Sequence, residues 1–346
     1  MAHHMQSPKD YLRQIEEEEA RRSDRPSGRS PWRWVKRMLL VLFVIVLAAL
    51  AFAGWFSIST LRGVSSNPFD VSRLSSDAAG RTNVLVLGVG DPGHAGQDLS
   101  DSIMVVSFER SSKQVATISI PRDTEVSIPG YGYRKINNAN ALGGSALAAQ
   151  AVSGLLGVPI DYTVTTNFSG LKQLVDAVGG LDVTVKEALV DNEYPCVTNQ
   201  YLSCGVNIQP GQQRMDGAKV LEYTRCRKGT CGNDFGRAER QQEVIGLLMA
   251  KLVQPSVWLN PVSATAISNA LRTGITTDLS GPNMVRLAWA WSRKAADPVR
   301  WVLSTASGGL LTSSGSSTNL LPAGGDYSAI QQQAATIFTN PPKVEE

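Results

Sequence analysis

The fold of this chain follows from three apolar segments, NVLVLG (83–88), IMVVSF (103–108) and QVATISI (114–120). Each has the length of a buried strand, is rich in β-branched residues, and is bounded by glycine, proline or charged residues. The polar turn ERSSK between the second and third segments predicts an antiparallel hairpin. Pairing about this turn sets Asp101, which precedes one strand, opposite Arg122, which follows the other.

Downstream of the hairpin, segments with helical and strand patterns alternate. We expect helices over 139–156, 169–178 and 234–252, and strands at TVTTNF (163–168) and LDVTV (181–185). Two more helical segments, near 261–271 and 282–294, lead to the strand-like WVLST (301–305). This alternation predicts an α/β domain in which a mixed central sheet is flanked by helices.

Composition divides the chain into further parts. A charged, flexible tail (1–37) precedes a charge-free apolar run that predicts a transmembrane helix over 38–57. The following parts are a linker (58–80), a catalytic domain (81–254), its helical C-terminal extension (255–305) and a loose Gly/Ser-rich tail (306–346). Arg33, Lys36 and Arg37 precede the apolar run and only Arg62 follows it closely, so we expect a single-pass protein with a cytoplasmic amino terminus and an extracytoplasmic domain. The alternative is a cleaved signal peptide, which the long basic region and long apolar run disfavour.

Four cysteines, Cys196, Cys204, Cys226 and Cys231, lie on the predicted exported side and are close in pairs. Two local disulfides are expected there, and pairing 196 with 204 and 226 with 231 closes the shortest loops, although spacing alone does not fix the connectivity. A zinc site is disfavoured because no spacing is Cys-X-X-Cys and the chain has 3 histidines.

A dense cationic stretch, RCRKGTCGNDFGRAERQQ, spans 225–242. Arg225 and Arg227 share one face of an extended segment, while Arg237, Arg240 and Gln241 share one face in the first two turns of a helix. A helix amino terminus presents free backbone donors and positive potential, so these residues predict a site for a multiply charged anion, with a diphosphate as the natural ligand. The alternative is a set of surface salt bridges with acidic residues of the same helix. The net charge of +3 says little about partners beside this local cluster.

The glycine-rich loop GVGDPGHAGQDLSDS (88–102) carries carboxylates that are candidate metal ligands. Asp101 and Asp91 predict a site for magnesium, or manganese, completed by phosphate oxygens and water. The alternative is that these are turn and cap residues. Arg122 would face Asp101 and act as the catalytic arginine, with Asp123 orienting it, unless Arg122 and Asp123 form a structural pair.

Other chemistries are disfavoured. The sequence has no Gly-X-Ser-X-Gly, no Walker lysine loop and no plausible His/Cys pair, so a covalent enzyme intermediate is not expected. No nucleic-acid partner is expected, because the cationic cluster lacks an aromatic platform and the domain is predicted to be exported.

Five motifs, taken in order, resemble the LytR-CpsA-Psr family over roughly residues 81–254. They are IPRDT (120–124), KINNANALGG (135–144), IDYTVTTNFSGLKQLVDAVGGLDVTV (160–185), MDGAKVLEYTRCR (215–227) and DFGRAERQQ (234–242). The resemblance implies an enzyme of bacterial envelope assembly, which moves a glycopolymer from a polyprenyl diphosphate carrier to peptidoglycan and forms a phosphodiester bond. It also implies an apolar tunnel for the prenyl chain.

The resemblance assigns roles by position. Asp101 corresponds to the family's magnesium-binding aspartate, Arg122 to its catalytic arginine, and the five residues of the cationic stretch to those that grip the diphosphate. The chain departs from the family pattern in three places. Leu99 stands where many members have arginine, Asp91 is displaced by one position, and the cysteine-bearing insert at 192–206 is not a general feature.

Two other functions compete with this one. The first is a polyprenyl diphosphate phosphatase, in which water replaces the sugar hydroxyl. The second is a non-catalytic lipid or cell-wall binding sensor, consistent with Leu99. The glycopolymer, the prenyl length, the oligomeric state and the general base are not specified by the sequence.

Overall fold

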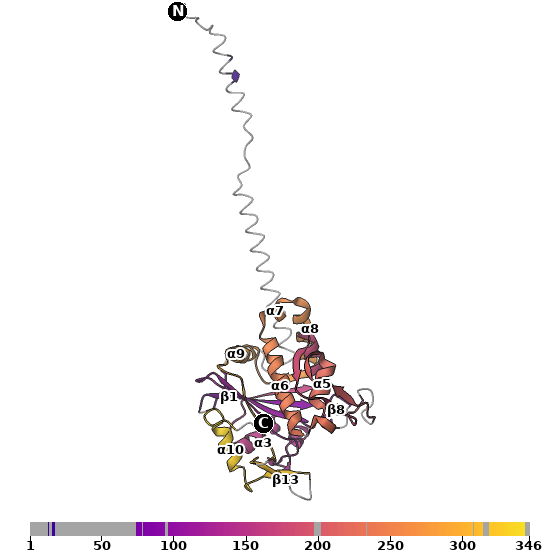
Figure 1. The fold of residues 1–346 in the computed structure, drawn as a ribbon. Helices are drawn as coiled ribbons and strands as arrows, with labels where there is room; N and C mark the ends of the chain where they lie inside the picture. The colour runs from indigo at the N-terminus through magenta and orange to yellow at the C-terminus, as the bar shows by residue number, and fades with distance from the viewer. Residues whose placement is uncertain are drawn as a thin grey trace, which may run out of the picture. The chain divides into compact units, whose positions relative to one another are not determined.

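The computed structural model describes residues 74–77, 79–93, 96–196, 202–232, 234–306, 308–313 and 318–342, together with Arg13, Glu16 and Glu17. The chain separates into two units, Met1–Phe56 and Ser57–Glu346, and the fold below is that of the second (Figure 1). The predicted transmembrane helix at 38–57 lies outside the described residues, as do nearly all of the tail and most of the linker. No helix in the described ranges has the length and apolar character needed to span a bilayer.

A six-stranded mixed sheet forms the centre of the domain, in the order β11-β6-β1-β2-β3-β12. Its strands are β1 (Arg81–Val89), β2 (Ser102–Glu109), β3 (Gln114–Ser119), β6 (Tyr162–Asn167), β11 (Ile275–Thr277) and β12 (Val299–Val302). β1 and β3 each pair antiparallel with β2, while β6 and β12 run parallel to their neighbours β1 and β3. The predicted mixed sheet and its hairpin are therefore confirmed.

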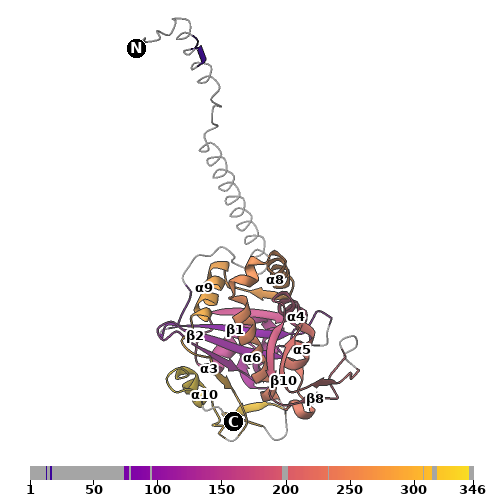
Figure 2. The ribbon, with the colours of Figure 1, turned by 45° about the horizontal axis from the view of Figure 1, so that its top comes forward.

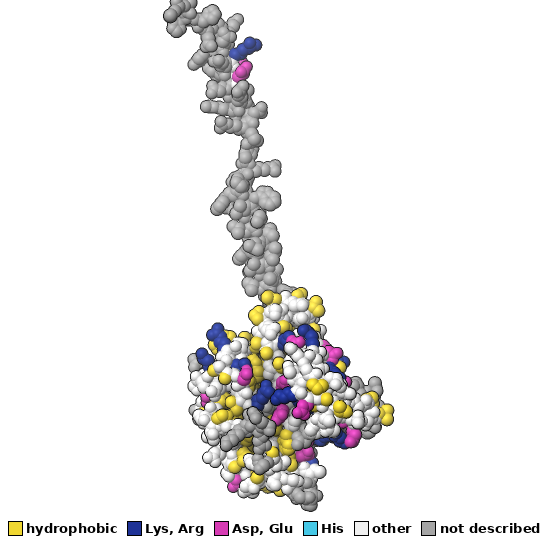
Figure 3. All heavy atoms as spheres, viewed as in Figure 1, with side chains coloured by type: hydrophobic (Ala, Val, Ile, Leu, Met, Phe, Trp, Pro, Cys, Tyr) yellow, Lys and Arg dark blue, Asp and Glu magenta, His cyan; other side chains and the backbone are white. Residues whose placement is uncertain are grey.

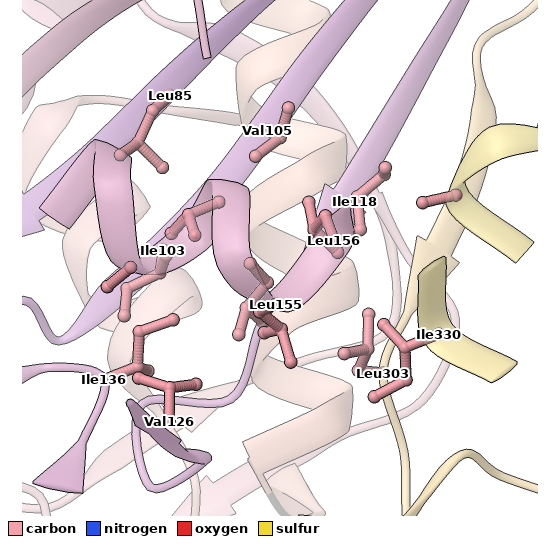
Figure 4. Close-up of a cluster of buried hydrophobic side chains, with 14 of the residues drawn as sticks. Leu85, Ile103, Val105, Ile118, Val126, Ile136, Leu155, Leu156, Leu303 and Ile330 are labelled. Atoms are coloured by element: carbon pink, nitrogen blue, oxygen red, sulfur yellow. The ribbon is translucent and has the colours of Figure 1, made fainter. Parts of the chain in front are cut away.

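Helices cover both faces of this sheet, which explains why β2 is buried along nearly its whole length instead of alternating (Figures 1 and 2). The helices are α3 (Asn138–Leu156), α4 (Phe168–Ala177), α5 (Gly217–Arg225), α6 (Asp234–Leu252), α7 (Pro255–Leu259), α8 (Pro261–Gly274), α9 (Gly281–Ser292) and α10 (Ser328–Ala335). One core cluster joins the sheet to α3 and α10, where Leu156 lies beside Ile118 and Ile330 lies beside Leu303 (Figure 4). A second cluster packs Leu287 and Trp291 of α9 against the opposite face.

A third core cluster lies beside the sheet and unites α4, α5, α6 and α8 with a small hairpin. The small two-stranded sheets pair β7 (Leu181–Val185) with β10 (Gly211–Met215), β4 (Glu125–Ile128) with β5 (Gly132–Lys135), β8 (Leu189–Asp191) with β9 (Val206–Ile208), and β13 (Leu311–Ser313) with β14 (Leu320–Pro322). Ile267 of α8 is fully buried in this third cluster, so the predicted C-terminal extension shares the core of the domain.

The predicted loose tail at 306–346 is wrong for its described part. Its residues form β13, β14 and α10, and Ile330, Ala334 and Ile337 are buried against α3 and β12. These three residues have the i, i+4, i+7 spacing of one helix face, which gives the segment enough apolar surface to join the core. The preceding Gly/Ser-rich run, which suggested a loose end, contributes β13 and β14 in its described part.

Candidate active site

The hairpin register brings Asp101 and Arg122 together. Met104 pairs with Ser119, and Ile120 donates its backbone N–H to Ile103 O at 2.9 Å, so the residues beyond both strand ends lie side by side. Arg122 Nη1 donates to Asp101 Oδ1 at 2.6 Å. The predicted juxtaposition is confirmed. Both side chains keep part of their surface open, 39% for Asp101 and 26% for Arg122.

Arg122 is held as a cation. Burial opposes its charge, but the hydrogen bond and charge of Asp101, with the charges of Asp123 and Asp234, raise the pKa of Arg122 above its ordinary value. Its Nε is buried and has no hydrogen-bond acceptor among the described residues, with Asp123 Oδ2 at 3.8 Å. A buried donor without an acceptor costs about 1–3 kcal/mol. An anion that reached this nitrogen would therefore be stabilised.

Asp123 is engaged more closely by a lysine than by Arg122. Lys135 Nζ lies 2.6 Å from Asp123 Oδ1 and also donates to Thr318 Oγ1 at 2.6 Å. Lys135 ends β5, and the β4–β5 hairpin returns it beside the start of β4. Sequence reasoning did not assign Lys135 a role, although it opens the KINNANALGG motif. The predicted orienting role of Asp123 stays a prediction.

Arg237 completes the group of cations around Arg122. Its residue surface is 9% exposed, and its Nη1 lies 3.3 Å from Asp234 Oδ1. Burial lowers the pKa of Arg237, and the positive charges of Arg122 and Arg227 lower it further, against the opposing charge of Asp234. The positive charges of two arginines from other segments of the chain therefore act on Arg237. Figure 3 shows blue and magenta side chains side by side on the face that carries α6.

Arg225 and Arg227 lie at the end of α5 in different settings. The guanidinium of Arg225 stacks 4.1 Å from the ring centre of Phe168 and 5.7 Å from that of Tyr194. The backbone N–H of Arg227 donates to Asp191 Oδ2 at 3.2 Å, while its side chain is exposed. No sequence pattern indicated Phe168 or Tyr194, which come from a different helix and loop. Both rings face the guanidinium of Arg225.

Arg240 departs from the role predicted for it. Its guanidinium donates to Tyr223 O at 2.8 Å, to Cys231 O at 3.0 Å and to Cys226 O. Burial is the main factor that lowers its pKa. Because three of its N–H groups are committed to backbone carbonyls, we assign Arg240 to the loop between α5 and α6 and not to the direct phosphate contacts. The side chain of Arg240 points from α6 towards the end of α5. Helical periodicity alone does not predict this direction, because it depends on how the two helices pack.

Gln241 links three elements. Its Oε1 accepts a hydrogen bond from Ser102 Oγ at 2.8 Å, and its Nε2 lies 3.3 Å from Thr224 O. Ser102 is the first residue of β2 and directly follows Asp101. Gln241 therefore positions the amino end of α6 against Asp101, a contact that the sequence did not predict.

The loop between α5 and α6 is closed by a disulfide. The structure pairs Cys226 with Cys231 and Cys196 with Cys204, as the spacing favoured, with Cα–Cα distances of 5.7 and 4.9 Å. In the described part of the chain, the one group of three potential metal-binding side chains is Asp191 with Cys226 and Cys231. Those sulfurs are bonded to each other and cannot act as thiolate ligands, so this group is no metal site.

Of the two predicted metal ligands, Asp101 fits a magnesium ion better. Arg122 occupies its Oδ1, and its side chain is partly open, which suits an ion held by one carboxylate together with substrate phosphates and water. Asp91 accepts from Ser169 N at 2.9 Å and from Ser169 Oγ at 3.0 Å, so both of its oxygens serve the first turn of α4. A metal-binding role for Asp91 requires it to turn away from Ser169 and stays a prediction.

Two surface cavities lie away from these residues. One, of about 740 Å³, is bordered by Asp176, Arg214 and Lys219, and the other, of about 520 Å³, by Gln150 and Tyr162. Within the described residues, neither is lined by the arginines of the site. The predicted apolar tunnel is therefore not among these cavities, and it stays a prediction.

Comparison with known proteins places this geometry in context. The model of the LytR_cpsA_psr family matches residues 59–318. The chain is 33% identical over 260 residues to the polyisoprenyl-teichoic acid–peptidoglycan teichoic acid transferase TagU of Enterococcus faecalis, covering 72% of this chain and 80% of that protein. It is 31% identical over 247 residues to TagT of Bacillus subtilis, which carries the same transferase name, covering 67% and 74%. A solved structure of TagT bound to LI-WTA superposes with a TM-score of 0.59 at 25% identity, over 79% of this chain and 97% of that one.

Proposed function

Because the chain belongs to the LytR-CpsA-Psr family, we propose that it is a membrane-anchored phosphotransferase that attaches a glycopolymer from a polyprenyl diphosphate carrier to peptidoglycan. The new linkage is a phosphodiester. The relatives TagU and TagT are named as transferases of teichoic acid to peptidoglycan, which supports the reaction class. The proposed enzyme has a cytoplasmic amino terminus and works on the outer side of the membrane.

One observation carries the proposal: Arg122 and Arg227 both lie close enough to Arg237 for their positive charges to lower its pKa, beside a partly open Asp101. Like charges held together are unfavourable unless a counter-charge joins them. The acidic partners in contact, Asp101 and Asp234, offset only part of this repulsion. A diphosphate supplies the missing negative charge and matches the fork geometry of guanidinium groups.

The residues of the site have two kinds of role, binding the diphosphate and holding the surrounding loop in place. Arg122 binds a phosphate oxygen through its open N–H groups and stabilises the charge that develops on it as the bond to the leaving group breaks. Arg227 and Arg237 hold the other oxygens. Arg225, stacked on Phe168, keeps the end of α5 in place, while Arg240 and the Cys226–Cys231 disulfide fix the loop.

The bond changes balance as a simple displacement. A sugar hydroxyl of peptidoglycan forms a new O–P bond with the phosphorus nearest the glycopolymer, the P–O bond to the second phosphorus breaks, and polyprenyl phosphate leaves. The proton of the hydroxyl is released to the departing polyprenyl phosphate or to water, and not to Arg122, whose raised pKa keeps it fully protonated. A magnesium ion on Asp101, when bound, would neutralise diphosphate charge as a Lewis acid.

The test uses the purified full chain with a lipid-linked glycan analogue and a peptidoglycan oligomer. Wild type should form the glycan–peptidoglycan phosphodiester and release polyprenyl phosphate, and Arg122→Ala should lower the rate by about 10²–10³-fold. Arg214→Ala is the matched control, because Arg214 is an arginine with 61% side-chain exposure that lies 3.9 Å from Asp182, outside the site. Full transfer by Arg122→Ala would refute the assignment.

Product analysis separates the competing functions. Release of the same lipid product in the absence of acceptor, with no linkage formed in its presence, identifies a phosphatase. Binding of the lipid without turnover, with magnesium present, identifies a sensor. Chelation with EDTA tests the cofactor: activity lost and then restored by magnesium or manganese supports the assignment of a metal to Asp101, and unchanged activity opposes it.

A further inference from the structure

A group of large apolar side chains is exposed at one end of the domain. Leu259 and Val262, at the junction of α7 and α8, are 82% and 77% exposed, and Trp258 beside them is 45% exposed. On α9, Val285 and Trp289 are 69% and 59% exposed. Scattered single apolar residues on a surface need no explanation, but two groups of them beside the end of one helix, α6, do. We call these five residues the α7–α9 surface.

Both parts of this surface adjoin the carboxyl end of α6. α7 begins three residues after α6 ends, and α9 packs on the last turns of α6 through Met249 and Val253. The chain carries no charged residue from 252 to 271, a stretch that includes all of α7 and most of α8. Figure 3 shows the tip that carries α7 in yellow and white.

Basic residues border the surface on the α9 side. Arg293 lies 4.5 Å from the ring centre of Trp289, and Arg286 and Lys294 belong to the same helix or its end. Asp297, 3.7 Å from Lys294, is the acidic residue paired with this group. Exposed tryptophans with apolar neighbours and adjoining arginine and lysine are typical of a surface that sits at a membrane interface, where the rings enter the headgroup layer and the cations meet lipid phosphates.

The first described residues of the domain pack against α9, the helix that carries Val285 and Trp289. Leu74 packs in the same cluster as Leu287 and Trp291 of α9. Ser75 N donates to Tyr162 Oη at 3.0 Å, and Asn283 of α9 donates to the same oxygen at 3.3 Å. Sixteen residues (58–73) separate Leu74 from the end of the predicted transmembrane helix. A flexible linker of that length has a typical span of about 20–25 Å.

We infer that the α7–α9 surface docks on the outer leaflet of the membrane to which the chain is anchored, with Trp258 and Trp289 in the headgroup layer. The inference rests on the predicted anchor and not on the proposed reaction. It has a geometric consequence for that reaction. Arg237 and Arg240 lie 15 and 12 residues before Leu252, the last residue of α6, so they are about 18–23 Å along the helix from the docked end. A lipid whose diphosphate reaches them would have to extend its prenyl chain out of the bilayer along the domain.

The test places the full chain in nanodiscs of phosphatidylcholine and phosphatidylglycerol, with either ordinary or brominated acyl chains, and records tryptophan emission. Subtracting the emission of Trp289→Phe from that of the wild type gives the emission of Trp289. The same subtraction with Trp258→Phe gives the emission of Trp258. Both contributions should be strongly quenched by the brominated lipid. The matched control is Tyr133→Trp, which places a tryptophan at a 70% exposed position on β5, in the hairpin that contacts α3, and its added emission should not be quenched.

A second experiment tests the contribution of the basic residues to docking. Replacing Arg293 and Lys294 together by glutamine should shift the docked-to-undocked ratio by about fivefold per residue in discs with anionic lipid, and by much less in phosphatidylcholine alone. Unquenched emission from both Trp258 and Trp289 overturns the inference. Quenching that occurs only when two copies share a disc also overturns it, because a second copy then covers the surface.

Discussion

At its amino end α6 buries Arg237 and Arg240 among partners from α5, the disulfide loop and the β2–β3 hairpin, whereas its carboxyl end leads into α7, where Leu259 and Trp258 face solvent. The charged groups at the amino end find part of their hydrogen-bond and charge partners within the protein. The apolar side chains beyond the carboxyl end are exposed to solvent. The two ends of α6 therefore differ: contacts within the protein hold the side chains at the amino end, whereas the apolar side chains at the carboxyl end need an external partner to cover them.

The amino end also teaches that equal burial does not mean equal role. Arg237 and Arg240 are both 9% exposed and lie within one turn of each other. Arg240 gives its guanidinium to backbone carbonyls, and Arg237 shares its environment with two other arginines. We therefore expect one to contribute to activity and the other to folding, and the first two predictions test that division.

The largest effect is expected for Arg237→Met, which removes the charge and keeps most of the volume. Transfer should fall by about 10²-fold or more, because a preorganised donor to the phosphate is lost. The free energy of unfolding should fall by less than about 1 kcal/mol, or rise, since repulsion from Arg122 and Arg227 is relieved. The rate of transfer and urea unfolding check the two parts. A large loss of stability with activity retained per folded molecule would reverse the assignment.

Arg240→Met should show the opposite pattern. It leaves three buried or partly buried carbonyls, those of Tyr223, Cys226 and Cys231, without their charged donor, at an expected cost of about 3 kcal/mol or more in the free energy of unfolding. Urea unfolding followed by circular dichroism measures it. Arg240→Lys, which keeps the charge and loses the fork, should recover only part of the stability. If Arg240→Met is as stable as wild type and inactive, Arg240 belongs with the phosphate contacts after all.

A smaller effect is expected from the two disulfides, which can be compared with each other because both close short loops. Each closes a short loop, with separations of 5 and 8 residues, so breaking either by a double serine substitution should cost about 2 kcal/mol in the free energy of unfolding. Only the Cys226–Cys231 pair lies in the loop that carries Arg227. We expect the Cys226→Ser/Cys231→Ser chain to lose transfer activity by about tenfold through a looser phosphate contact. The Cys196→Ser/Cys204→Ser chain should keep it. Equal activity losses in both would show that the loop is not specifically coupled to the site.

The sequence predicted this amino end in part. Register in an antiparallel hairpin depends on local pattern and turn length, so the contact between Asp101 and Arg122 followed from residues 103–120 alone. The rotation of Arg240 towards the end of α5 depends on how two helices and a loop pack, which no local pattern contains. The stacking of Arg225 on Phe168 and the pairing of Asp123 with Lys135 were missed for the same reason.

In the carboxyl-terminal segment, which packs on α3 and β12, composition misled the pattern reasoning. The Gly/Ser-rich run before α10 suggested a loose tail, while the buried face of Ile330, Ala334 and Ile337 only makes sense once α3 presents a surface to it. The α7–α9 surface was not seen either, because exposure is a property of the folded neighbours. Apolar residues at helical spacing predict burial, and on α9 Trp291 is buried while Trp289, two positions earlier, is exposed.

The smallest effect is expected at this exposed end. Leu259→Glu should change the free energy of unfolding by no more than about 0.5 kcal/mol, because an 82% exposed side chain has few contacts to lose. The same substitution puts a carboxylate in the α7–α9 surface, where anionic lipid would repel it, so bilayer quenching of Trp258 should fall. Ile267→Glu is the contrasting change on the same helical pair, since Ile267 is fully buried and should not accept a charge without loss of the fold. A destabilisation by Leu259→Glu that approaches that of Ile267→Glu would mean that the surface is covered within the molecule, and the contrast between the two ends of α6 would not hold.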